Sequence, residues 1–287
     1  MFSSRIVMAT LIAMLTIAFG ADPAAAAKPL RPPSAERPLT PEEQAASDRR
    51  VAAAEAYVAQ VEAQGLNLVG LDCVTPTSSS NAIAPNACAI PQGFLAVEAR
   101  DQIRGHYCGP ATGQVISNYA WATGPGANKY LQTTIAGWMK TDVNGLTNAP
   151  ELEDGLESST VNAPRRPAGW DWVVTPLLDN DGDGTVSDQL HAMVRSNISS
   201  SKMPLAIAVK PYDVRGTYHL TSWIRPVSSP GHWIAAYGWV GLWTGTDSSR
   251  LYYADSSKDE GGATGKYWDP MRHIAAMIMA HTKRLVW

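Results

Sequence analysis

A cysteine followed by glycine and proline is the residue of this chain best suited to covalent chemistry. Cys108 stands in the sequence Tyr107-Cys108-Gly109-Pro110, directly ahead of a stretch that predicts a helix. The unpaired amide groups at a helix N-terminus carry a partial positive charge, which favours the thiolate form of a cysteine there. Because the thiolate is the attacking species, the position of Cys108 predicts a nucleophile.

A nucleophilic cysteine needs a base, and the histidine best placed for that role is His232. It follows the turn signal at 228–231 and opens an apolar run, so it would stand at the start of a strand. A strand end is a rigid mount for a catalytic group. His219, in a polar alternating segment, is the alternative base. We expect a solvent-facing role for His191, His273 and His281, and a surface or groove-lining role for His106.

Two further residues complete a candidate hydrolase site. Asp255 ends the apolar run 251–254, so its carboxylate would emerge at an adjacent strand end and hold the second imidazole nitrogen. The alternative is that Asp255 only forms a turn. Gln102 precedes Cys108 by six residues. Its amide, with the backbone N–H of Cys108, is a candidate donor pair for the oxyanion of a tetrahedral intermediate.

At these positions the chain resembles the papain-clan family thirty-nine cysteine peptidases, and in particular their soluble, secreted peptidase C-39-like branch. The resemblance runs from about Gln102 to the C-terminus and rests on Gln102 with Cys108-Gly-Pro-Ala, on Gly231-His232 and on the strand that ends at Asp255. It implies a papain-like α+β fold, in which the cysteine helix packs against an antiparallel sheet. The implied roles are Cys108 as nucleophile, His232 as base and acid, Asp255 as orienting group and Gln102 as oxyanion donor.

Founding members of this family cut bacteriocin leaders after a double glycine, but two departures argue against that substrate here. The residue before the nucleophile is often acidic in transporter-linked members and is Tyr107 in this chain, and the sequence carries no membrane domain or nucleotide-binding cassette. We therefore predict a secreted cysteine peptidase that acts on a peptide or protein substrate and needs no cofactor for catalysis. The alternatives are a catalytically inactive extracellular binding module on the same fold, and a cell-wall amidase or acyltransferase.

Residues 179–187 match the first nine positions of a calcium-binding loop, with oxygen ligands at alternate residues and a glycine for the turn. The glutamate expected at the twelfth position is replaced by Leu190, so Asp188 or a carboxylate from elsewhere would complete the site. The alternative is a solvated acidic turn that caps the helix starting near Ser187. We expect a structural calcium ion, because closely spaced aspartates repel one another without a cation. Its ligands would be Asp179, Asp181, Asp183 and Thr185.

The elements that must position these residues run from helices to strands, which predicts an α+β domain over residues 99–287. Apolar spacing predicts helices at 108–119, around 131–139 and around 152–156, a short helix at 190–198 and a final helix at 270–280. The predicted strands cover 170–174, 204–209, 232–239, 250–254 and 283–287, and the last of these would close the sheet.

Residues 1–27 have the pattern of a secretory signal peptide, with Arg5, an apolar run at 6–19 and small residues ending at Ala27. The run is shorter than the roughly 18 residues of a membrane span, and the first cysteine, Cys73, lies too far along to carry a lipid. We therefore predict secretion, cleavage after Ala27 and no stable membrane anchor. An oxidising compartment favours a disulfide between Cys73 and Cys88, which leaves Cys108 unpaired. The alternative role for Cys108 is that of a small buried hydrophobe.

Two predicted segments lie between the signal and the catalytic domain. Residues 28–39 are rich in proline and charge and predict a tether. Residues 40–98 begin with the cap and proline of Thr40-Pro41 and predict a helix to about Gln64, followed by the disulfide-closed loop. This helix either packs on the main domain or acts as a pro-segment. A net charge of -3 without a basic cluster argues against nucleic acid as a partner, and the sequence leaves the oligomeric state unknown.

Overall fold

An antiparallel sheet joins the elements that carry the candidate site. The computed structural model describes residues 37–63, 92–141, 145–178, 186–212, 218–224, 231–241, 249–258 and 262–287. The strands in these ranges are β1 (Gln92–Phe94), β2 (Val174–Pro176), β3 (Leu205–Val209), β4 (His232–Val240), β5 (Arg250–Asp255), β6 (Gly265–Pro270) and β7 (Arg284–Val286). Within the described residues they form one seven-stranded sheet in the order β2-β7-β3-β4-β5-β6, with β1 paired to β4.

Helices pack against this sheet, so the described residues form an α+β protein, as the order of the predicted elements indicated. Their bounds are α1 (Pro41–Ala63), α2 (Cys108–Ala120), α3 (Gln132–Trp138), α5 (Ala149–Thr160), α6 (Ser187–Ser196) and α7 (Met271–Met279), and a π-helical turn, η1 (Asn197–Ser201), continues α6. All described residues belong to one compact unit, Pro33–Trp287. Among the described helices, none combines the length and the apolar character needed to cross a bilayer.

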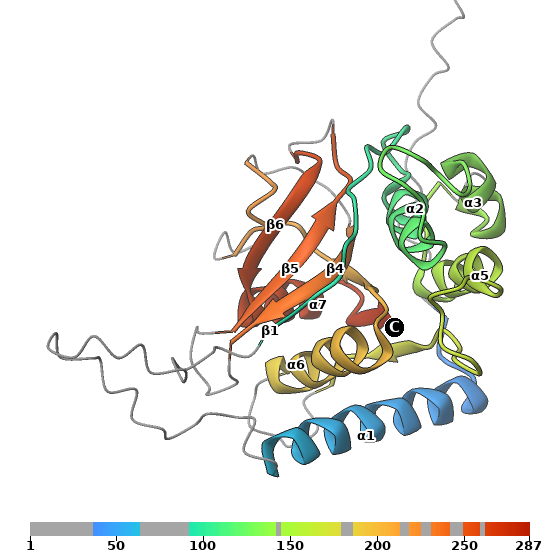
Figure 1. Cartoon of the computed structure of the whole chain (residues 1–287). Helices are drawn as coiled ribbons and strands as arrows, with labels where there is room; N and C mark the ends of the chain where they lie inside the picture. The colour runs from blue at the N-terminus through green and yellow to red at the C-terminus, as the bar shows by residue number, and fades with distance from the viewer. Residues whose placement is uncertain are drawn as a thin grey trace, which may run out of the picture. The chain divides into compact units, whose positions relative to one another are not determined.

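The helices pack in two groups, which Figure 1 shows beside the sheet and below it. Helices α2, α3 and α5 contact one another, and α2 also packs on β3 and β4. Helix α1 contacts α6 and β2, while α7 contacts β3. The predicted N-terminal helix therefore packs on the rest of the unit, which was one of its two expected roles.

The central strands β3 and β4 read as continuous apolar runs because both of their faces are covered. Every residue of β3 is buried, and so is β4 from His232 to Trp239. Helix α2 contacts both strands, and α7 and α6 contact β3 and β4 respectively. Strands without a solvent face lose the polar alternation of half-exposed strands. The predicted strands at 204–209, 232–239 and 250–254 correspond to β3, β4 and β5.

Two helical glycines allow α2 and α5 to approach the end of α3 closely. A Cβ atom at Gly113 would lie 2.6 Å from Cε of Met139, and a Cβ atom at Gly155 would overlap the same side chain. Met139 is fully buried. Glycine inside a helix costs about 1 kcal/mol relative to alanine. At these two positions, dense packing between three helices offsets the lower helix propensity of glycine.

The sheet differs from the prediction at its periphery. The predicted strand at 170–174 is wrong over most of its length, because β2 begins only at Val174 and pairs with β7. The preceding residues Trp170 and Trp172 stack edge to face at 4.5 Å, and the indole of Trp172 donates to Thr160 of α5. Their aromatic side chains therefore serve helix packing. Strands β1 and β6 were not predicted.

Several predicted features lie outside the described residues. These are the signal peptide at 1–27, most of the tether at 28–39, the cysteines Cys73 and Cys88, and the candidate calcium ligands Asp179, Asp181, Asp183 and Thr185. Their structural roles stay predictions.

Candidate active site

The candidate nucleophile is the first residue of α2, the position that the sequence predicted. Cys108 is partly exposed and is a free cysteine in the described part of the chain. The N–H groups of a first helical turn have no partner within the helix, so they point toward whatever approaches the thiol. Tyr107, the residue before the helix, is fully buried and anchors its start.

One hydrogen bond ties the helix of Cys108 to strand β4, and a second ties β4 to Thr147, which packs against the start of that helix. The hydroxyl of Thr112 donates to the carbonyl oxygen of Trp233 at 3.0 Å, and the indole of Trp233 donates to the carbonyl oxygen of Thr147 at 2.8 Å. Gly109 permits this approach, because a Cβ atom there would overlap Thr147. Since Trp233 follows His232 directly, these contacts fix the nucleophile relative to the base.

His232 opens β4 and lies between the thiol and a carboxylate. The ring is 3 % exposed, and its Nε2 is 2.7 Å from Oδ1 of Asp255. Burial by itself lowers the pKa of His232, but the charge and hydrogen bond of Asp255, together with a hydrogen bond to Cys108, raise that pKa to about 10. The ring therefore favours its protonated form, and an imidazolium stabilises a thiolate beside it.

Asp255, the last residue of β5, is fully buried and accepts hydrogen bonds on both carboxylate oxygens. The donors are Nε2 of His232 at 2.7 Å, the Ser222 hydroxyl at 2.6 Å, the Trp223 indole at 3.1 Å and the backbone N–H of Ser257 at 2.8 Å. Burial would raise the pKa of this carboxyl, but the charge and hydrogen bond of His232 and the other donors hold it below its usual range. Asp255 is therefore an ionised partner for the imidazole.

Ser222 and Trp223 are site residues that the sequence reasoning missed. Besides donating to Asp255, the Trp223 ring packs against His232 with centroids 5.1 Å apart, and it is 1 % exposed. Trp223 thus shields the His232–Asp255 hydrogen bond from water. A serine and a tryptophan side by side in an otherwise polar segment were the available signal.

A second buried carboxylate supports this segment. Asp269 of β6 accepts from the backbone N–H of Thr221 at 3.0 Å, from the Thr221 hydroxyl at 2.7 Å and from the Tyr253 hydroxyl at 2.6 Å. Burial and the charge of Asp269 raise the pKa of Tyr253, so its hydroxyl stays a donor. Asp269 therefore holds the backbone from which Ser222 and Trp223 reach Asp255.

Gln102 is also brought to this region. It is 5 % exposed, and its backbone N–H donates at 2.9 Å to the carbonyl oxygen of Ser256, the residue after Asp255. One N–H of its side chain donates to the carbonyl oxygen of Gly105 at 3.1 Å. Its Oε1 is buried without a hydrogen-bond partner among the described residues, so the polar capacity of this amide is not used up by the fold.

The other histidines take structural positions. His219, the alternative base, stacks on Tyr212 with ring centroids 5.1 Å apart, and the two residues form a β-bridge. The solvent-facing role expected for His191 is wrong, because the ring lies edge-on to Trp239 of β4 and the residue is 2 % exposed. Burial lowers the pKa of His191 to about 4. His273 stacks on Tyr218, and His106 lies edge-on to Tyr107.

His281 also departs from its expected solvent-facing role. Its ring lies against Gly231, the residue before His232, so that a Cβ atom at Gly231 would overlap it. Burial, with the charges of Lys210 and His232, lowers the pKa of His281 to about 4. A neutral imidazole therefore stands beside the candidate base.

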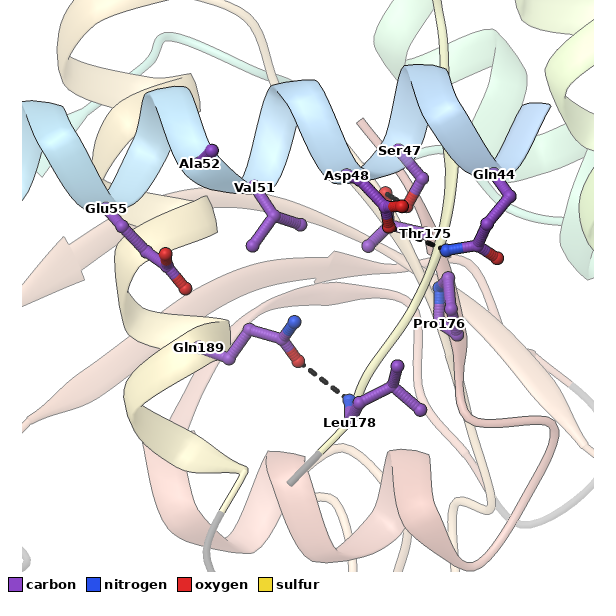
Figure 2. Close-up of a pocket in the computed structure, with 10 residues that line it drawn as sticks. All are labelled: Gln44, Ser47, Asp48, Val51, Ala52, Glu55, Thr175, Pro176, Leu178 and Gln189. Carbon is purple, nitrogen blue, oxygen red and sulfur yellow. Dashed lines mark hydrogen bonds between the residues drawn. The ribbon is translucent and has the colours of Figure 1, made fainter. Parts of the chain in front are cut away.

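A groove of about 260 Å³ lies elsewhere, between α1 and the start of α6 (Figure 2). Its lining residues are Gln44, Ser47, Asp48, Val51, Ala52, Glu55, Thr175, Pro176, Leu178 and Gln189. None of them is a cysteine or a histidine, so the groove offers neither a nucleophile nor a base of the kind found around Cys108. Within the described ranges, no cluster of three or more histidine, cysteine or acidic side chains is arranged to hold a metal ion.

Comparison with known proteins gives no assignment, since neither a family model nor a curated protein matches the chain. The family resemblance stated from the sequence therefore stays a prediction. In the site itself, the thiol at the start of α2, the imidazole at the start of β4 and the carboxylate at the end of β5 stand in series.

Proposed function

We propose that this chain is a cysteine peptidase of papain-like fold that hydrolyses peptide bonds. The observation that carries the proposal is the position of His232, buried between the free thiol of Cys108 and the ionised Asp255. A buried histidine with only a structural role does not require both a thiol at one ring nitrogen and a carboxylate at the other. This series is the arrangement required for an activated nucleophile.

In the first half of the reaction, His232 starts as the imidazolium that its raised pKa favours, and it already holds the proton that the Cys108 thiol gives up. The thiolate attacks the carbonyl carbon of the scissile bond, and the carbonyl oxygen becomes an oxyanion. The side-chain amide of Gln102 and the backbone N–H of Cys108 are the donors proposed to stabilise this charge. His232 then gives its proton to the leaving amine as the carbon–nitrogen bond breaks, which leaves a thioester on Cys108.

In the second half, a water molecule hydrolyses this thioester. His232 takes one proton from the water, whose oxygen attacks the thioester carbonyl. The carbon–sulfur bond breaks, the acid product leaves, and the proton stays on His232 beside the restored thiolate. Asp255 keeps the same ring orientation through both halves, because His232 Nε2 donates to it while the other nitrogen faces the sulfur.

Two accompanying proposals come from the sequence. The pattern at 1–27 supports secretion of the enzyme, with a disulfide between Cys73 and Cys88. The spacing of Asp179, Asp181, Asp183 and Thr185 supports a structural calcium ion. Neither is part of the reaction above.

The test is turnover of a quenched fluorescent peptide library by the purified protein, with Cys108→Ala as the control. We expect cleavage that the control lacks, and rapid alkylation of Cys108 by iodoacetamide at mildly acidic pH, where ordinary thiols are protonated. Slow alkylation together with an inert library would support the binding module instead. Transfer of the acyl group to an added amine, without hydrolysis, would identify an acyltransferase.

A further inference from the structure

One buried amide bonds to the backbone on both sides of Gln102. Gln132, the first residue of α3, accepts at Oε1 from the backbone N–H of Ile103 at 3.0 Å. Its Nε2 donates to the carbonyl oxygen of Asp101 at 2.7 Å. Gln132 is only 4 % exposed. A single side chain thus clamps the short segment from which the proposed oxyanion donor projects.

The same amide reaches the helix of the nucleophile. Nε2 of Gln132 also donates to Oε1 of Gln114 at 3.0 Å, and Gln114 is a buried residue of α2, the helix that begins at Cys108. The amide of Gln114 is itself fixed, since it donates to the carbonyl oxygen of Tyr130 at 2.7 Å. Gln132 therefore links the element that carries the thiol to the segment that carries Gln102.

The other contacts of this segment come from the opposite side. The backbone N–H of Gln102 donates to Ser256 at 2.9 Å, and Asp101 forms an ion pair with Lys258 at 3.2 Å. Both of these partners follow Asp255 in the chain. The segment is thus held toward the strand of Asp255 by one set of bonds and toward α2 by Gln132.

We propose that Gln132 is a positioning residue for catalysis, which sets the distance between the amide of Gln102 and the sulfur of Cys108. The inference rests on the peptidase function proposed above and deepens it. Gln132 does not touch the reacting atoms, and it acts only through Gln102. An oxyanion donor contributes fully only when it is held in the geometry of the transition state.

The chemistry of the clamp requires a carboxamide. One atom must accept from Ile103 and the other must donate to both Asp101 and Gln114. Glutamate accepts but has no donor when ionised, so Gln132→Glu would place a carboxylate against two acceptor oxygens. Alanine removes both functions, and methionine fills the space without either.

The experiment compares Gln132→Ala with Gln102→Ala, with the double variant and with Gln189→Ala as a matched control. Gln189 is also a buried glutamine that accepts from a backbone N–H, that of Leu178 at 2.7 Å, but it lies in the groove of Figure 2. The readouts are kcat and KM for the best library peptide, inhibition by the corresponding peptide aldehyde, and the rate of alkylation by iodoacetamide. Should Gln132→Ala melt well below the wild type, Gln132→Met gives the same comparison.

We expect Gln132→Ala to lower kcat by about 10- to 100-fold and to change KM by less than about 2-fold. The affinity for the aldehyde should fall with kcat, because its hemithioacetal carries an oxyanion. The double variant should be no slower than Gln102→Ala within about 2-fold, since both substitutions disable one donor. Alkylation forms no oxyanion, so its rate should stay at the wild-type value.

Three results overturn this inference while leaving the proposed function in place. The first is an active wild type with Gln132→Ala as fast as Gln189→Ala, and the second is losses in kcat that multiply in the double variant. A fall in the alkylation rate equal to the fall in kcat also overturns it, because the defect would then lie in the thiol. A wild type without Cys108-dependent turnover rejects the proposed function, and the role of Gln132 falls with it.

Discussion

Replacing Asp255 with asparagine removes the charge beside His232 while keeping the size of its partner. In the wild type the imidazolium is lost as the pH rises through the raised pKa of His232, about 10. An opposite charge in contact raises a pKa by about 1 to 3 pH units. The pH at which kcat/KM falls on the alkaline side should therefore be lower by that amount in Asp255→Asn. Without the charge of Asp255, less attraction offsets the effect of burial, which lowers the pKa of His232.

The same substitution should also lower stability. The carboxylate oxygen that accepts from Ser222 and Trp223 becomes an NH2 group if the other atom still accepts from His232. The Ser222 hydroxyl can turn and accept, but the indole can only donate. One buried N–H then lacks its partner, which costs about 1 to 3 kcal/mol in the free energy of unfolding.

The pH dependence of stability gives a second check with a defined sign. The pKa of Asp255 is lowered in the folded protein, so its contribution is present above its unfolded pKa and disappears as the pH falls through the folded value. Asp255→Asn should therefore lose less stability on acidification than the wild type does.

The assay is kcat/KM from pH 5 to about pH 11, together with urea unfolding at several pH values. Asp171→Asn is the control, because Asp171 is a well exposed partner of Arg166. An alkaline limb at the same pH in Asp255→Asn and the wild type would refute the role of Asp255 in holding the proton on His232. An unchanged limb in Asp171→Asn is needed to exclude a general effect of net charge.

Further predictions concern the support of the site and the packing around it. Trp223→Phe keeps a ring beside His232 but removes the donor to Asp255. We expect a lower kcat in activity assays and a free energy of unfolding that is lower by about 1 kcal/mol in urea. Unchanged values would show that this hydrogen bond contributes to neither activity nor stability. Gly155→Ala should cost about 1 to 3 kcal/mol by urea unfolding, because the added methyl group meets Met139; a gain in stability would mean that helix propensity outweighs the overlap. Burial raises the pKa of Glu153 to about 7, so the wild type should lose stability as the pH rises from 4.5 to about 7. In thermal melts, Glu153→Gln should be more stable than the wild type above that range, and the two proteins should be alike at about pH 4. A chelator should lower the melting temperature if residues 179–187 hold calcium, and an unchanged midpoint would argue against the ion.

The residues at element ends were the predictable part of the site. Cys108 begins an apolar helical pattern, and His232 follows a sequence signal for a turn and opens an apolar run, so local signals alone located both at element starts. Asp255 ends a strand that the same kind of signal marked. His232 and Asp255 meet because β4 pairs with β5, the adjacency of strand ends that was expected for these two residues.

The supporting residues could not be predicted because their roles arise from tertiary contacts. Trp223 lies in an isolated bridge to Gly262, without the periodicity of a strand. Asp269 and Gln132 act through residues distant in the sequence, and nothing in their immediate neighbours indicates a role. His191 was expected at the surface because that is the default for a histidine in a helical segment, whereas its ring packs against Trp239 of β4, a contact that local sequence does not indicate.

The components of the site come from two layers that are joined in different ways. His232 and Asp255 belong to adjacent strands of one sheet, whereas Cys108 belongs to a helix tied to that sheet by the hydroxyl of Thr112 and by side-chain packing. A loosening between the layers would separate sulfur from imidazole while the imidazole kept its carboxylate. Heat or mild denaturant should thus abolish activity before the secondary structure is lost, so inactivation would be an early sign of unfolding.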